Sequence, residues 1–508
     1  MRTSSPITPP TVASRRAPLV IRNADDVVRA VDEANAAGDP SQRRRAAYQT
    51  LLVTIIALGG VFVDAYDFSS MSIGTIQLRH VFHLSGTQVG EVSAAMAASA
   101  LLGALIGGYF VDKLGRRRMF SLDLWLLVLA AIGASLAPNL ATLVGFRILM
   151  GIGVGLDFPV ALCFVAEFSD KARRGRFVNS SYANWYLAAI LGYGAGWVGY
   201  ELGAGPSLWR YAVGFGAVPA AILLVLRYRY MLESPLWAAH QGDLNEAARI
   251  LRRTRSLDVE VDAVAAKTVA ATVHARPGAK ATAKILFSRR YRKRAILAAV
   301  MGCAQSVEYY AVVFYLPVIS QLIFGHSLLK ALLGGAIFSA VGLLGASVQA
   351  WICDRTGIRP LALIGSLLAT TALIGIGVGH AEKSVLLEAF MVGLFMVGHT
   401  IGPGPQCMAY GTLSFPTIIR GSAVGWTQGM LRVGSVTGFL IFPILQAALG
   451  FSATFTTLAV CPFVILVATL LIRWEPIGVD IEKEWTDQQI EVNLTDSAIP
   501  LAPVALLS

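Results

Sequence analysis

Long apolar runs alternate with short polar segments along most of the chain. A helix that spans a bilayer needs about 20 mainly apolar residues, and twelve runs of about that length are present. Six precede residue 231 and six follow residue 294, at 46–76, 87–111, 119–137, 140–166, 179–200 and 209–228 and then at 295–319, 328–352, 360–379, 385–411, 421–446 and 449–473. The pattern predicts an all-α membrane protein of twelve transmembrane helices in two six-helix pseudo-repeats.

Polar segments divide the chain around these runs. We expect five parts: an N-terminal segment 1–45, a six-helix bundle 46–230, a basic linker 231–294, a second six-helix bundle 295–473 and a tail 474–508. The linker holds 13 Lys and Arg against 6 Asp and Glu, and it lacks an apolar run long enough to cross a membrane.

Composition and charge agree with a membrane protein. Hydrophobic residues make up 55% of the chain and charged residues 14%, whereas about a quarter of the residues in soluble domains are charged. The net charge of +11 would suit nucleic acid, but the basic residues lie between the apolar runs. Lys and Arg in short loops are retained in the cytoplasm. The sequence therefore predicts a multi-pass protein of the cell (plasma or inner) membrane with both termini cytoplasmic and no nucleic-acid partner.

Residues for enzyme chemistry are not apparent. We find no nucleophile with an adjacent base, no ATPase signature and no metal-binding spacing among the five cysteines. The sequence predicts a protein that is not an enzyme, needs no cofactor or metal, and acts as a monomer in a lipid bilayer.

Two copies of one motif stand about half a chain apart. The first reads GGYFVDKLGRRRM and resembles the cytoplasmic signature of the major facilitator superfamily, with Gly108, Asp112, Gly115, Arg116 and Arg117 at matching positions. The second, AWICDRTGIRP, keeps Asp354 and Arg355 but has alanine where glycine is expected. The resemblance implies the major facilitator fold, whose two halves rock about a midplane site to give alternating access.

Further segments resemble proton-coupled members of that superfamily. AEFSDKARRGRF and MLESPLW, which contain Glu167, Arg176 and Glu233, are similar to signatures of sugar porters and metabolite:proton symporters, and FVDAYDFSS and GLDFP are similar to phosphate:proton transporters. Neither solute class fits fully. The tenth-span asparagine of phosphate transporters is Gly404 here, and the paired glutamines of the sugar-transporter seventh span are represented by Gln305 alone.

Charged residues inside apolar runs are functional candidates, because each costs about 2.5–3.5 kcal/mol to insert. In the first run Asp64 and Asp67 are three residues apart and share a helix face. Asp67 follows Tyr66 as the proton-carrying aspartate does in the sugar:proton symporters that the chain resembles. We predict Asp67 as the main proton carrier, Arg147 as its switch, and Asp64 and Asp157 as secondary sites. The alternative is a static buried ion pair between Arg147 and one carboxylate.

The second half offers candidates for the solute. Arg432 and Gln428 are four residues apart on the eleventh run, and a guanidinium can hold a carboxylate through two parallel hydrogen bonds. Organic-anion carriers and aromatic-acid symporters of the superfamily show a similar arginine there. The alternative is an ion pair of Arg432 with Glu308. The predicted solute-binding residues are Arg432, Glu308, Gln305, Gln428, Tyr309, Trp185, Asn184 and Gln406, and His399 is a further candidate for proton coupling.

The favoured function is secondary active transport, namely proton-coupled symport of a small organic anion such as a carboxylated or aromatic acid metabolite. Symport of inorganic phosphate, or of a sugar or polyol, stays open as an alternative. A nutrient receptor without net transport is the competing class.

Overall fold

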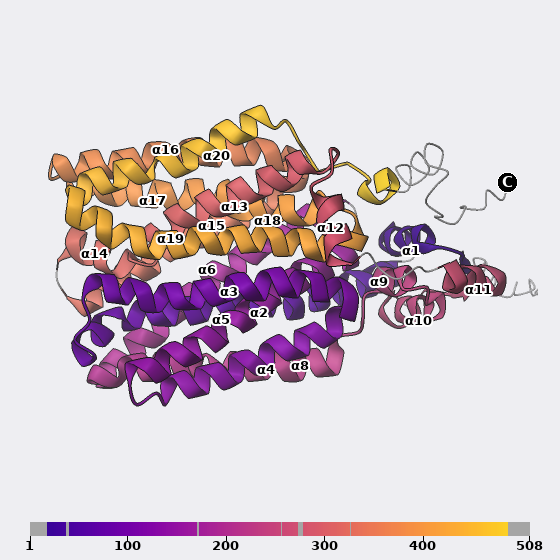
Figure 1. Ribbon diagram of the computed structural model, residues 1–508, viewed down its shortest axis with the longest axis horizontal. Helices are drawn as coiled ribbons and strands as arrows, with labels where there is room; N and C mark the ends of the chain where they lie inside the picture. The colour runs from indigo at the N-terminus through magenta and orange to yellow at the C-terminus, as the bar shows by residue number, and fades with distance from the viewer. Residues whose placement is uncertain are drawn as a thin grey trace, which may run out of the picture.

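The computed structural model describes residues 18–36, 40–169, 172–255, 257–272, 278–325 and 327–485. Two groups of long helices lie side by side, one built from the first half of the chain and the other from the second half (Figure 1). All described elements are helical except two short strands. The expected all-α membrane fold is therefore confirmed.

The first half contains six spans. They are α2 (Pro40–Val81), α3 (Gly86–Leu114), α4 (Arg116–Ser135), α5 (Leu140–Phe168), α6 (Arg174–Glu201) and a sixth span made of α7 (Leu208–Phe215) and α8 (Ala217–Tyr230), with the one-turn helix η1 (Gly205–Ser207) before it. Side-chain caps begin some of these helices: Ser85 forms a capping box with Gln88, and Asn139 accepts a hydrogen bond from the amide of Thr142.

The second half repeats this arrangement with more interruptions. Its spans are α13 (Arg292–Val312) continued by α14 (Leu316–Phe324), α15 (Leu328–Thr356), α16 (Ile358–Ala381), α17 (Val385–Ile401) continued by α18 (Pro403–Leu413), and α19 (Thr417–Leu458) with α20 (Val460–Leu471). The positive φ of +78° at Gly450 separates the eleventh span from the start of the twelfth within α19.

Ten segments in the described residues are long and apolar enough to cross a membrane. One of them, Thr417–Leu471, is 55 residues long and holds two spans joined at Gly450. The other difference is α6, which is 28 residues long but is too polar to count by hydropathy. Dividing Thr417–Leu471 into two spans and adding α6 brings the ten segments to the twelve expected spans.

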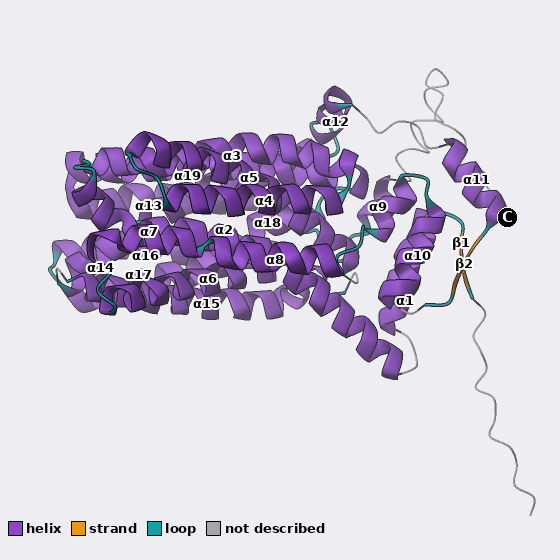
Figure 2. Ribbon diagram, turned by 90° about the horizontal axis from the view of Figure 1, so that it is seen from below, coloured by secondary structure: helices purple, strands orange, loops and turns teal. Residues whose placement is uncertain are grey.

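The remaining elements gather at one end of the helix bundle, which we call the linker end; the opposite end is the far end (Figure 2). They are β1 (Leu19–Ile21), α1 (Ala24–Ala36), α9 (Pro235–His240), α10 (Leu244–Arg255), β2 (Val259–Val261), α11 (Ala263–Thr272) and α12 (Ala279–Leu286). The strands pair in parallel, Leu19 opposite Val259. The described parts of the N-terminal segment and of the linker thus meet in one small subdomain, with Ile21 and Val27 fully buried.

The two halves meet where small residues let helices approach closely. A methyl group at Gly108 of α3 would lie 2.6 Å from the carbonyl oxygen of Gly421 on α19. A methyl group at Gly342 of α15 would lie 2.5 Å from the ring of Tyr186 on α6. Because lipid provides no hydrophobic drive between helices, this close packing is what holds such halves together.

Candidate functional site

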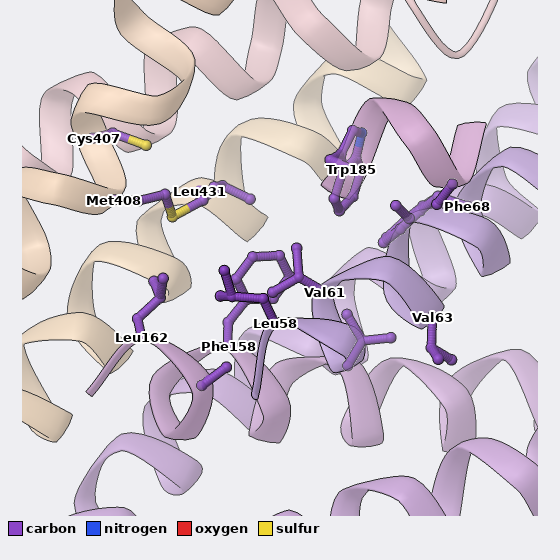
Figure 3. Close-up of a cluster of buried hydrophobic side chains, with 14 of the residues drawn as sticks. Leu58, Val61, Val63, Phe68, Phe158, Leu162, Trp185, Cys407, Met408 and Leu431 are labelled. Atoms are coloured by element: carbon purple, nitrogen blue, oxygen red, sulfur yellow. The ribbon is translucent and has the colours of Figure 1, made fainter. Parts of the chain in front are cut away.

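A cavity lies between the two halves, and about 370 Å³ of space free of protein atoms lies within it and its opening. Figure 3 shows apolar side chains of this region, with Val61 and Phe158 from the first half near Met408 and Leu431 from the second. Six helices contribute to its wall, with Val61, Phe158, Ser181, Tyr182, Trp185, Gln305, Ser306, Tyr309, Tyr310, Met408, Leu431 and Arg432 as the lining residues. Neither half could form this site alone.

Polar groups of the wall join the halves across the cavity. The indole N–H of Trp185 on α6 donates to the Tyr309 hydroxyl on α13 at 2.5 Å. The Tyr182 hydroxyl donates to Oε1 of Gln305 at 3.4 Å. The buried hydroxyls of Ser181 and Ser306 have no hydrogen-bond partner in the described part of the chain, so they are available to a bound solute.

Arg432 is the charged residue of the wall. Its side chain is 1% exposed, and its guanidinium lies over the rings of Phe68 and Phe158, 5.3 and 5.5 Å from the ring centroids. It donates to the Tyr310 hydroxyl at 3.3 Å, while its Nε has no partner and no carboxylate lies within 4 Å among the described residues. The guanidinium is thus a buried cation without a paired anion.

The expected alternative partner of Arg432 binds elsewhere. Oε1 of Glu308 lies 3.0 Å from Nδ1 of His399 on α17, and both side chains are fully buried. The proposed static pair between Arg432 and Glu308 therefore does not form. Arg432 instead faces the first half, where Asp64 is near enough to attract it electrostatically.

Four residues expected to bind solute lie outside the cavity wall. Glu308 pairs with His399, and Gln428 bonds to the sulfur of Met408 at 2.6 Å rather than turning toward the solute space. Gln406 donates to Oε1 of Gln349 at 3.1 Å in a buried amide network. Asn184 is half-buried on α6 and also lies outside the wall.

The first half holds two buried carboxylates that lack partners. Asp64 and Asp67 are at most 1% exposed, and no described residue forms a hydrogen bond with their carboxylate oxygens. Arg147 lies beside Asp67 but donates to its main-chain oxygen, at 3.2 Å, so the side-chain ion pair considered as the alternative is not formed between them here. Nε and NH2 of Arg147 also lack partners in the described ranges. Opposite charges therefore lie close together without being locked in an ion pair.

Asp157, by contrast, is fixed by an arginine that the sequence interpretation missed. NH2 of Arg227 lies 2.7 Å from Oδ1 of Asp157, and NH1 of Arg227 lies 3.2 Å from Oδ2 of Asp123. Gly60 makes room for this cluster, because a methyl group there would overlap the Asp157 carboxylate. Asp123 and Arg227 both lie in apolar runs, so the charges themselves were a signal that they matter.

The motif residues form contacts between the halves at the linker end. Asp112 at the end of α3 accepts hydrogen bonds from the amides of Gly421 and Ser422 in α19, at 3.1 and 2.9 Å. Asp354 at the end of α15 accepts from the amide of Arg176 in α6, at 3.1 Å. The two motif copies therefore make matching contacts, each from one half to the first turns of a helix in the other.

The glycines of the two motifs occupy matching turns. Gly115 and Gly357 have φ of +92° and +89°, a conformation that favours glycine. A glutamate closes each turn: Glu233 accepts from the amides of Arg116 and Arg117 at 3.0 and 3.2 Å, and Glu475 accepts from the amide of Arg359 at 2.8 Å. The side chain of Arg117 is exposed, and the guanidinium of Arg355 lies 5.5 Å from the Trp351 ring centroid.

A chain of alternating charges continues the linker-end contacts. Arg116 contacts Glu167 at 2.6 Å, Glu167 lies 3.7 Å from Arg420 of the second half, and Arg420 contacts Glu482 at 2.8 Å. Burial disfavours the charged form of Glu482, but Arg420 outweighs it and holds the pKa of Glu482 below its usual range. This carboxylate therefore stabilises the closed linker end above its unfolded-state pKa, and that contribution is lost as the pH falls through the lowered value.

Replacing Glu482 with glutamine is expected to loosen the start of α19. Glu482 accepts from the Thr417 amide at 2.9 Å and from Arg420, and a hydrogen bond to a charged group is worth about 1.5–3 kcal/mol. Hydrogen exchange at Thr417 should become roughly tenfold faster or more. Glu484→Gln is the control, because Glu484 instead contacts Arg290, which precedes α13, and Arg294 in the first turn of α13. Equal acceleration in both variants would contradict this assignment.

Comparison with known proteins agrees with this architecture. The sequence model of the family described as sugar (and other) transporter matches residues 52–484. The putative metabolite transport protein YaaU of Escherichia coli is 28% identical over 398 residues, which cover 78% of this chain and 85% of that protein. The inner membrane metabolite transport protein YgcS of Escherichia coli is 27% identical over 427 residues, with 84% and 91% covered.

A solved structure has the same fold. The proton:xylose symporter XylE, bound to 6-bromo-6-deoxy-D-glucose, superposes with a TM-score of 0.75 at 20% identity, covering 87% of this chain and 99% of that chain. The family match spans both halves and the whole linker between them. The chain therefore belongs to the sugar (and other) transporter family of the major facilitator superfamily, and it is a multi-pass membrane transporter.

Proposed function

We propose that this transporter carries a small organic anion together with protons by alternating access. The observation that carries the proposal is Arg432, a buried cation in the wall of the central cavity with no carboxylate within 4 Å among the described residues. A buried charge is costly without a partner, and an anionic solute supplies that partner. Arg432 therefore makes a cavity that holds an anionic solute more stable than one that holds only water.

The walls suit a planar carboxylate. Phe158, Trp185 and Tyr309 offer aromatic surface, and Ser181 and Ser306 offer free hydroxyls beside Arg432. An aromatic acid would place its carboxylate on the guanidinium fork and its ring against these side chains. A relative supports this chemistry: the niacin transporter NiaP of Acinetobacter baylyi is 24% identical over 406 residues, and niacin is an aromatic carboxylic acid.

Proton coupling would use the unpaired carboxylates of the first half. Asp67 lies beside Arg147, and Asp64 is near enough to Arg432 to be attracted to it electrostatically. An anion bound to Arg432 neutralises the positive charge that attracts the Asp64 carboxylate. A proton bound to Asp64 then neutralises this carboxylate in place of the arginine. Solute and proton binding thereby favour each other, as symport requires.

The linker end is proposed to face the cytoplasm. The last turn of α3 and the first turn of α4 at this end carry Lys113, Arg116, Arg117 and Arg118, and the linker carries most of the remaining basic surplus, which follows the retention of basic segments inside the cell. A cysteine introduced at exposed Lys267 should react with a membrane-impermeant maleimide in inside-out vesicles and not in intact cells. The reverse labelling pattern would invert this orientation.

A polyol is the second candidate solute. The amide of Gln305 and the hydroxyls of Ser181, Ser306 and Tyr182 would hydrogen-bond a polyhydroxylated molecule. The major myo-inositol transporter IolT of Bacillus subtilis is 26% identical over 381 residues. In this case Arg432 would balance the charge of the protein's own Asp64 and would not bind the solute.

Uptake by the purified protein in proteoliposomes distinguishes these functions. Benzoate, nicotinate, phosphate, myo-inositol and D-xylose are offered with and without an acidic exterior. We expect accumulation of a carboxylate that requires the pH gradient. Uptake of myo-inositol or D-xylose alone supports the second candidate, accumulation of phosphate alone supports phosphate symport, and binding without entry indicates a receptor.

Replacing Trp185 with phenylalanine is expected to weaken solute uptake moderately. The lost hydrogen bond to Tyr309 joins the two halves over the cavity, and a bond of this kind is worth about 0.5–1.5 kcal/mol, which corresponds to a roughly three- to tenfold higher apparent KM. Trp197→Phe is the matched control, because Trp197 lies on the same helix and bonds to exposed Glu201. An unchanged KM in Trp185→Phe would show that this contact does not hold the solute-bound state.

A further inference from the structure

We propose that Glu308 and His399 form a second proton-binding site, in the second half of the protein, that carries one proton per cycle in addition to the proton of the first half. The transport step of this inference rests on the proposed symport, whereas the proton-binding pair is argued from the structure alone. The site lies outside the cavity wall and apart from the Asp67 and Arg147 group.

The pair is sealed from water. Glu308 on α13 and His399 on α17 are both 0% exposed, and Oε1 of the carboxyl group lies 3.0 Å from Nδ1 of the imidazole. Oε2 of Glu308 and Nε2 of His399 have no hydrogen-bond partner among the residues that the structure describes. The two groups therefore have each other as partners.

No described residue around the pair provides a compensating charge. Tyr182 and Tyr186 of α6 and Cys461 of α20 are near enough to the carboxyl group to feel its charge, and Tyr309 stacks on the imidazole. Cys407 and Tyr410 lie on α18, while α15 and α16 bear charged residues only near their ends. Arg432 on α19 turns toward Phe68 and Phe158 instead. Tyrosine and cysteine are ordinarily neutral at physiological pH, so they do not balance a carboxylate.

Charge balance then fixes the proton count in this closed conformation. A carboxylate beside a neutral imidazole would leave one negative charge buried without a cation, which is strongly unfavourable. One additional proton makes the pair neutral overall, either as a carboxylic acid beside imidazole or as a carboxylate beside imidazolium. The pair therefore holds one dissociable proton while it is sealed.

A short route leads from the pair to the cavity. A methyl group at Gly404 would lie 2.9 Å from Nε2 of His399 and 2.5 Å from the ring of Tyr182, so these groups are packed together around Gly404. Tyr182 and Tyr309 both line the cavity. The tenth span is interrupted at Gly402, between α17 and α18, three residues beyond His399. Movement at this break would expose Nε2 to water, and the proton would then leave to that water.

The pair can be tested without any solute. Infrared difference spectra of the reconstituted protein, taken between acidic and alkaline buffer, should show a titrating carboxyl or imidazole signal that Glu308→Gln removes and His399→Gln shifts or removes. Glu388→Gln is the matched control, because Glu388 pairs with His380 at 2.6 Å near the far end, where His380 is partly exposed. This control should keep the signal of the buried pair. Spectra of Glu308→Gln and His399→Gln that both superimpose on the wild-type spectrum would overturn the proposal.

The transport arm uses benzoate and nicotinate as probes, with myo-inositol as the neutral alternative. Protons and radiolabelled solute entering proteoliposomes are counted together, and Glu308→Gln should lower the proton-to-solute ratio by one while Glu388→Gln leaves it unchanged. For a carboxylate, uptake driven by an inside-negative potential alone should be lost in Glu308→Gln. An unchanged ratio overturns the proposed second proton. If no probe enters the wild-type vesicles, the proposed function is contradicted, and the infrared experiment still shows whether Glu308 and His399 bind the proton.

Discussion

Replacing Arg432 with alanine is expected to weaken binding of a carboxylate solute by about 100-fold. The guanidinium lines the cavity, is 1% exposed and has no paired carboxylate among the described residues. Hydrogen bonds to charged groups are worth about 1.5–3 kcal/mol, and a two-pronged contact lies at the upper end of that range, which corresponds to roughly 100-fold in affinity. The thermal shift that benzoate or nicotinate produces in the purified protein measures the effect.

Two variants sharpen this result. Arg432→Lys keeps the charge but loses the planar fork, so it should bind more weakly than wild type and more tightly than alanine. Gln428→Ala is the matched control one turn earlier on α19, because Gln428 contacts Met408 and lies outside the cavity wall. Wild-type carboxylate affinity in Arg432→Ala, with a normal unfolding temperature, would show that the arginine serves Asp64 and not the solute.

The spans could be predicted because the bilayer imposes a simple rule on the sequence. Each crossing needs about 20 apolar residues, and the helices begin and end within a few residues of the expected runs, as in α3 and α15. The interruptions could not be predicted in the same way. Gly402, with φ −109° and ψ −106°, sits inside a continuous apolar run, and hydropathy does not register a change in backbone direction.

That break explains why part of the site was missed. Beyond Gly402 the helical periodicity of the preceding residues no longer predicts which side of the helix a residue occupies. The Gln406 side chain accordingly hydrogen-bonds to Gln349 and Asn179 and does not line the cavity. The sequence also does not show which atoms each buried arginine contacts. Arg147 and Arg227 both lie near buried aspartates, but only three-dimensional packing shows that Arg227 binds Asp157 through its side chain while Arg147 binds a main-chain oxygen of Asp67.

The repeated motif of the sequence coincides with a repeated local geometry at the linker end. An aspartate three residues before a glycine recurs at Asp112 and Asp354, and both carboxylates reach amides of the opposite half. The pairing of β1 with β2 was not foreseen, because three-residue strands leave no periodic signal. A motif that occurs twice in the chain is therefore easier to recognise in the sequence than a short strand whose pairing depends on tertiary contacts.

Replacing Asp67 with asparagine is expected to abolish accumulation driven by a pH gradient while leaving exchange of solute between the two sides. Asp67 is 1% exposed and no described residue bonds to its carboxylate oxygens, so it can be neutralised by a proton without breaking a side-chain contact. One pH unit across the membrane supplies about 1.36 kcal/mol per proton, which sustains about tenfold accumulation. Asparagine cannot take up or release that proton, so the variant should reach equal concentrations on both sides.

Counterflow and melting temperature separate this carrier role from a static one. If Asp67 mainly balanced Arg147, its neutralisation would leave a buried cation and lower stability by several kcal/mol, and both accumulation and exchange would fail. The carrier role predicts near-normal melting with exchange intact. Asp123→Asn is the contrasting variant, because Asp123 is bound by Arg227 in an ion pair at 3.2 Å and its loss should affect stability first. Wild-type accumulation in Asp67→Asn would instead move the proton to Asp64, whose carboxylate is equally buried and unpaired among the described residues.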